Sequence, residues 1–137
     1  PDVLEGLPLR HVVEVRHDSF KVPEFVELLA KYNVAPVCAD HFDYPMIADV
    51  TADFVYARLQ KGSDEIETCY TKPDMKDWAK RLKTWSAGSV PDDLPLIDET
   101  RKPAKTARDV YAFFIHEGKV NAPGGAMAMQ EMLDAKS

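Results

Sequence analysis

The sequence predicts an α/β fold of the (β/α) TIM-barrel type, here half of a barrel with four parallel strands and covering helices. Short, nearly continuous apolar runs alternate with segments of helical periodicity, as expected for parallel strands covered by helices. An ionisable residue ends each apolar run, at the edge where barrel enzymes build their active sites. A chain of 137 residues forms one domain at most, and four strand–helix units are half of an eightfold barrel.

The first predicted strand covers residues 11–17, where three valines fall in a run of seven residues. Side chains alternate across a strand, so Val12, Glu14 and Arg16 share one face. A strand that is otherwise apolar but carries a glutamate and an arginine on one face indicates a functional site rather than a core.

The first predicted helix begins at Pro23, because a first helical turn does not need the N–H that proline lacks. Asn33 marks its end. The face predicted to pack inward carries apolar residues at positions i, i+3, i+4 and i+7, which are Phe25, Leu28, Leu29 and Tyr32.

The later elements continue this alternation. The sequence predicts strands at 35–40, 53–59 and 110–115, a helix from Pro73 to Gly88, a long polar loop at 89–106, and a last helix opening at 122–125. A flavodoxin-like open sheet is the competing fold. It usually has a fifth strand and a phosphate-binding loop, and neither is evident in this sequence.

Composition limits the compartment and the partners. A net charge of −6 and a pI near 5.2 disfavour a protein that coats nucleic acid, although they leave room for a local basic pocket. Neither a membrane-spanning run nor a secretory segment is evident. Cys38 lies in an apolar strand and Cys69 in a polar loop, so a disulfide is unsupported and a reducing cytoplasm is expected.

The beginning of the chain is unusual. It starts at Pro1 without an initiator methionine and reaches a core strand within about ten residues. Either a leader has been removed or the chain is a piece of a longer protein, and we favour the second interpretation.

Four charged side chains are predicted to project into one barrel mouth, namely Glu14, Arg16, Asp40 and Arg58. One interpretation is a layer of ion pairs that neutralise one another inside the barrel. The other is a pocket that binds and converts an anionic or hydroxylated small molecule. In that case Glu14 or Asp40 is the general base, and the arginines hold an anion or a developing oxyanion.

The end of the fourth strand and the loop after it add His116 and Lys119 as candidate substrate-binding residues. Barrels often bind a phosphate in the loops after their last two strands, and glycines stand in both loops here, at Gly62 and Gly118. The histidines and acids have no recognised metal-ligand spacing, so no metal is assigned and the cofactor is left unknown.

The chain also resembles the C-terminal half of the YecE-like family, domain of unknown function 72. The most specific matching motif is Leu9-Arg10-His11-Val12-Val13-Glu14-Val15-Arg16-His17-Asp18-Ser19-Phe20, and further matches are Ala39-Asp40, Phe54 to Leu59, Asp109 to Phe114, and Lys119 to Pro123 with Ala126-Met127. The resemblance implies strands five to eight of a single-domain barrel about twice this length. Two positions depart from the family pattern, because Gln60-Lys61-Gly62 stands where His-Gly is common and Ile115-His116 where Asn-Asn is common.

Two classes of function follow from these expectations. The first is a barrel enzyme acting on a small anionic or phosphorylated substrate at the C-terminal strand ends. The second is a non-catalytic binding protein for nucleic acid or a nucleotide. A homodimer, or a missing N-terminal half, is expected to cover the exposed sheet face, which is predicted to carry Val12, Phe54, Tyr56, Ala112 and Phe114.

Overall fold

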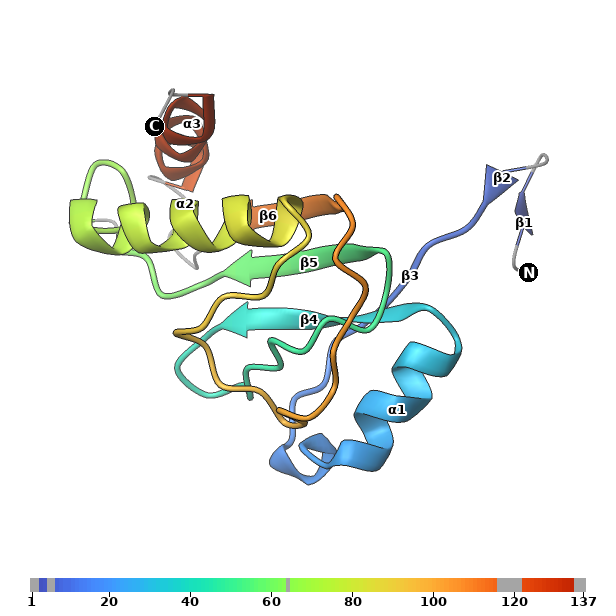
Figure 1. Ribbon diagram of the computed structural model, residues 1–137. Helices are drawn as coiled ribbons and strands as arrows, with labels where there is room; N and C mark the ends of the chain where they lie inside the picture. The colour runs from blue at the N-terminus through green and yellow to red at the C-terminus, as the bar shows by residue number, and fades with distance from the viewer. Residues whose placement is uncertain (1–2, 5–6, 64, 116–121, 135–137) are drawn as a thin grey trace.

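The computed structural model describes residues 3–4, 7–63, 65–115 and 122–134. The elements are, in chain order, β1 (Val3–Leu4), β2 (Leu7–Pro8), β3 (His11–Val13), the short 3-10 helix η1 (Asp18–Phe20), α1 (Pro23–Lys31), β4 (Val34–Asp40), β5 (Phe54–Leu59), α2 (Lys72–Ser86), β6 (Asp109–Phe114) and α3 (Ala122–Asp134). Figure 1 shows β1 and β2 standing apart from the main sheet.

The main sheet has four strands in the order β3-β4-β5-β6, and every neighbouring pair is parallel. The prediction of consecutive parallel strands is therefore confirmed, and the sheet is flanked by helices without being closed. The first strand is shorter than predicted, because pairing with β4 ends at Val13 rather than near residue 17. Glu14 and Arg16 therefore lie just beyond the carboxyl end of β3.

One face of the sheet carries the hydrophobic core. Helix α1 packs against β4, whereas α2 and α3 pack against β6 and against each other. Trp78, Leu82 and Trp85 of α2 are buried in this core. The sheet residues that join them alternate along the strands and include Cys38, Val55, Ala57 and Leu59.

No helix of the described residues covers the other face, which we call the open face. Residues that pair in register share a face, so Tyr56 lies beside Tyr111, and Arg58 beside Phe113. Tyr111 and Phe113 are exposed. The prediction that Ala112 and Phe114 belong to this face was wrong, because both pack against the helix-covered core. Successive residues of β6 point to opposite faces, and the structure assigns the two faces the other way round from the prediction.

The inward face of α1 also differs from the predicted one. Val26 and Leu29 are buried, whereas Leu28 and Tyr32 are exposed. The sequence holds two overlapping apolar stripes, and α1 presents only one of them to β4. The predicted end of the helix is correct, because Asn33 adopts the left-handed conformation with φ of 54°.

The long loop between α2 and β6 is held in its middle by Asp49 and near its two ends by Arg108, both of which are buried. The Asp49 carboxylate accepts the backbone N–H groups of Ile97 and Asp98 at 2.8 and 3.0 Å. The buried Arg108 guanidinium donates four hydrogen bonds, at 2.8 to 3.1 Å, to the backbone carbonyls of Trp85, Gly88, Ser89 and Ala104. The last carbonyl groups of a helix have no hydrogen-bond donor within the helix, and Arg108 supplies one to the carbonyl of Trp85 in the last turn of α2.

Both cysteines are buried. Cys38 fits the prediction, but Cys69, expected in a polar loop, packs into the core close to Gly62. A Cβ atom at position 62 would collide with the Cys69 sulfur, so this loop needs glycine for close packing. Among the helices of the described residues, none is long and apolar enough to cross a membrane.

Candidate functional site

A carboxylate bridges two arginines where β3 and β5 end. Arg58 Nη1 donates to Glu14 Oε1 at 2.5 Å, and Arg16 Nη2 donates to Glu14 Oε2 at 3.2 Å. The parallel arrangement creates this contact, because the carboxyl ends of parallel strands meet at one edge of the sheet. The ion pairing that the sequence suggested among the four charged residues is therefore present at Glu14, which pairs with both arginines.

The two arginines differ in their surroundings. The Arg58 side chain is 23% exposed and that of Glu14 is 19% exposed, so this pair is largely removed from water. The Arg16 side chain is 61% exposed, and its guanidinium carbon lies 4.8 Å from the centre of the Tyr44 ring. One carboxylate faces two guanidinium groups, so the cluster carries one positive charge in excess. Arg16 is the more accessible of its two cations.

A shallow cavity of about 400 Å³ lies beside this cluster on the open face. Glu14 and Arg58 form its polar part, and Val12, Tyr56 and Phe113 are among its apolar walls. The Tyr56 and Phe113 rings lie 5.1 Å apart, centre to centre. An apolar cavity with a few convergent charged groups is the usual composition of a small-molecule site.

Asp40 is not part of this cluster. It pairs in register with the fully buried Leu59, so its side chain lies on the helix-covered side. The Tyr70 hydroxyl donates to Asp40 Oδ2 at 2.8 Å and accepts the backbone N–H of Lys61 at 2.9 Å. Lys61 Nζ lies 3.8 Å from Asp40 Oδ1. Burial and the adjacent Asp40 carboxylate raise the pKa of the Tyr70 hydroxyl, which therefore acts as a hydrogen-bond donor.

The structure thus brings together three of the predicted residues, Glu14, Arg16 and Arg58, and separates Asp40 from them. His116 and Lys119 lie outside the described residues. Sequence reasoning missed Tyr44 and the Asp40–Tyr70 bond, and Tyr70 had no periodic pattern around it that would have predicted its burial.

The histidine after β4 organises a loop. His41 Nδ1 accepts the backbone N–H groups of Asp43 and Tyr44, at 2.9 and 3.0 Å. Its ring stacks on that of Tyr44, with centres 3.9 Å apart and planes 7° apart. Within the part of the chain that the structure describes, no three histidine, cysteine, aspartate or glutamate side chains are grouped as metal ligands would be.

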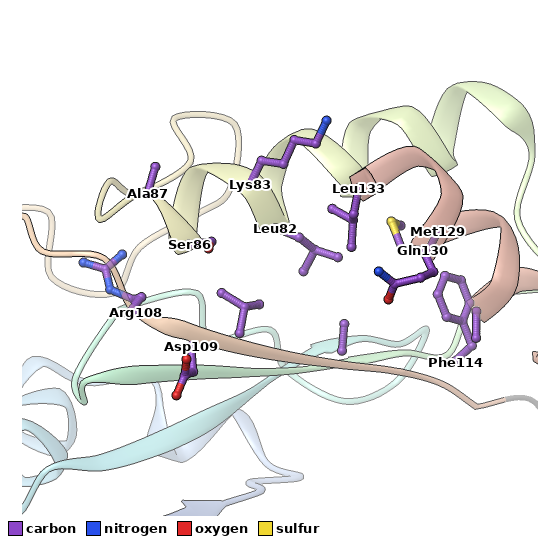
Figure 2. Close-up of a pocket in the computed structure, with 13 residues that line it drawn as sticks. Leu82, Lys83, Ser86, Ala87, Arg108, Asp109, Phe114, Met129, Gln130 and Leu133 are labelled. Carbon is purple, nitrogen blue, oxygen red and sulfur yellow. The ribbon is translucent and has the colours of Figure 1, made fainter. Parts of the chain in front are cut away.

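A second cavity, of about 590 Å³, lies on the helix-covered side between α2, α3 and β6. Figure 2 shows Leu82, Met129 and Leu133 pointing into it, whereas Asp109 points to the other side of β6. Arg108 lines it, but both of its terminal nitrogens are bonded to backbone carbonyls. This cavity therefore has a mixed polar and apolar lining, which contains none of the predicted site residues.

The fold and the site define an α/β protein with an open parallel sheet and a cationic cluster at the carboxyl ends of its strands. The chain belongs to the family described as a protein of unknown function, DUF72, whose model matches residues 2–137. No curated protein matches the sequence.

Two solved structures share the fold. A DUF72 family protein from Thermotoga maritima is 21% identical with a TM-score of 0.67, and the match covers 96% of this chain and 48% of that one. A DUF72 family protein from Enterococcus faecalis is 17% identical with a TM-score of 0.63, and the match covers 93% and 50%. The chain therefore spans about half the length of these structures.

Proposed function

We propose that this chain supplies the anion-binding part of a barrel enzyme that acts on a small anionic or phosphorylated substrate. The observation that carries the proposal is the Glu14–Arg16–Arg58 cluster, with its excess positive charge beside an apolar cavity. Guanidinium groups match carboxylate and phosphate oxygens in both charge and geometry. Ligands of parallel α/β proteins bind at the carboxyl ends of the strands, where this cluster lies.

The two arginines are assigned different roles. Arg16, exposed and held by the longer bond to Glu14, is the first to meet an incoming anion. When the anion takes the place of Glu14 at Arg16, the Oε2 atom of Glu14 is released and can accept a proton as a general base. Arg58 keeps its bond to Oε1 and holds the carboxylate in place. Asp40, also predicted as a base, is instead assigned the role of holding Lys61 and Tyr70.

We further propose that the sheet is the second half of a TIM barrel, strands five to eight, whose interior is the open face. The match to half of each solved DUF72 structure supports this arrangement. Within the described residues, β3 and β6 each have one edge without a partner strand. The other half of a longer protein, or a second copy of this chain, would pair these edges and cover Tyr56, Tyr111 and Phe113.

The test is binding of inorganic phosphate to the chain at low ionic strength, measured by calorimetry. Arg16→Gln and Arg58→Gln are each expected to weaken binding at least about tenfold, because the first removes a charge-assisted hydrogen bond to the anion and the second removes the excess positive charge of the cluster. Arg10→Gln is the matched control, since Arg10 also forms an ion pair, with Asp109, but at the amino end of the strands. Equal weakening by all three substitutions would indicate non-specific attraction and would refute the proposal.

A further inference from the structure

The most exposed large apolar side chain among the described residues belongs to Phe42, which is 78% exposed. It lies two residues after β4, at the carboxyl end of the sheet. Lys61 Nζ, on the segment after β5, is 5.4 Å from the centre of its ring. An exposed ring beside a cation is therefore placed at the edge of the sheet where ligands of this fold class bind.

The neighbouring Tyr44 shows the contacts that Phe42 lacks. The Tyr44 ring has both a planar partner, His41, and a cation, Arg16. The Phe42 ring has the cation, Lys61, but no aromatic contact is present for it among the described residues. Tyr44 and Phe42 lie on the same loop, between β4 and β5, so one loop contacts both Arg16 and Lys61.

This loop is fixed before any ligand arrives. The two backbone N–H groups bonded to His41 Nδ1 belong to Asp43 and Tyr44, directly after Phe42. Lys61 is held in turn, because its backbone N–H bonds to the buried Tyr70 and its ammonium group pairs with Asp40. A preorganised ring and cation lose little conformational entropy when a ligand binds.

We infer that Phe42 and Lys61 form a second subsite, which stacks on a planar aromatic or heteroaromatic ring of the substrate. The substrate class is then a phosphorylated compound that carries such a ring. This inference rests on the proposed function, because the phosphate of the same molecule is bound by Arg16 in the Glu14–Arg16–Arg58 cluster. Phe42 is a specificity-determining residue, and it takes no part in proton transfer.

The experiment compares three probes on the unaltered chain: inorganic phosphate, ribose 5-phosphate and adenosine monophosphate. The last two differ only by the planar base, so their affinity ratio reports the stacking subsite. The expected ratio is roughly tenfold or more in favour of adenosine monophosphate, as stacking of a base on an aromatic side chain supplies. Phe42→Ala should abolish this ratio, leave the affinity for ribose 5-phosphate unchanged, and be rescued by Phe42→Trp.

Tyr32→Ala is the matched control. Tyr32 is also an exposed aromatic residue, at 63%, with a lysine, Lys31, 5.5 Å from its ring centre, but it follows α1 and precedes β4, at the amino end of the sheet. This control should keep the full ratio. If ribose 5-phosphate and adenosine monophosphate bind equally while phosphate binding depends on Arg16, the stacking subsite is refuted and the proposed function stands. If no probe binds, both are refuted.

Discussion

The Glu14 carboxylate should couple much more strongly to Arg58 than to Arg16. We expect Glu14→Ala to lower the free energy of unfolding by about 2–3 kcal/mol. Removing one partner of a fully buried pair costs roughly 3–5 kcal/mol, and an exposed pair contributes about 0–1 kcal/mol. The Glu14 and Arg58 side chains are 19% and 23% exposed, which places their pair between these limits and nearer the first.

The two pairs can be separated by double-mutant cycles in urea denaturation. Cycles between Glu14→Ala and Arg58→Ala are expected to give a coupling energy of about 1–2 kcal/mol. Cycles between Glu14→Ala and Arg16→Ala should give about 0.5 kcal/mol or less, because Arg16 is largely solvated. The exposed Arg10–Asp109 pair supplies the control and should give a similarly small value. A coupling to Arg16 as large as that to Arg58 would refute the assignment of Arg58 as the structural partner.

Two further predictions concern Cys38 and the open face. Burial raises the pKa of the Cys38 thiol to about 12, whereas the pKa of a thiol in an unfolded chain is roughly 8.5. Between these values the folded state keeps a proton that the unfolded state releases, so this thiol lowers stability as pH rises. The free energy of unfolding of Cys38→Ala, measured by urea denaturation, should therefore rise relative to that of the unaltered chain by about 1.4 kcal/mol per pH unit above roughly pH 8.5. A difference that does not change with pH would contradict this prediction. The chain alone should sediment as a dimer, because nothing among the described residues covers its open face or pairs with the outer edges of β3 and β6. A monomer at the highest attainable concentration would contradict this prediction.

The strand and helix positions could be predicted because local signals determine them. Pro23 and Gly88 stand at the start of α1 and just after the end of α2, where a helix tolerates a missing N–H or needs a positive φ. The side of a strand on which a residue lies is less local. It depends on register with neighbouring strands, and a shift of one residue exchanges the two faces. The misassignment of Ala112 and Phe114 has this cause.

The site could be predicted only in part for the same reason. Glu14 and Arg16 are two residues apart in one segment, so their common face follows from the sequence. Placing Arg58 opposite them, and Asp40 away from them, requires the register of β4 against β5, which the sequence does not contain. The role of Arg108 could not be predicted from the sequence either, because its partners are backbone carbonyls, which every residue type has.

The attachment of the long loop determines how freely its sequence can change during evolution. Asp49 binds the N–H groups of residues 97 and 98, and Arg108 binds carbonyl oxygens, so neither contact depends on the side chains of the loop. Substitutions at 97 and 98 therefore preserve the attachment, with the exception of proline, which has no N–H to donate. Constraint on these contacts falls instead on Asp49 and Arg108 themselves. At the positions whose backbone groups they bind, the loop can therefore change in composition while keeping its path, provided that these two distant residues are retained.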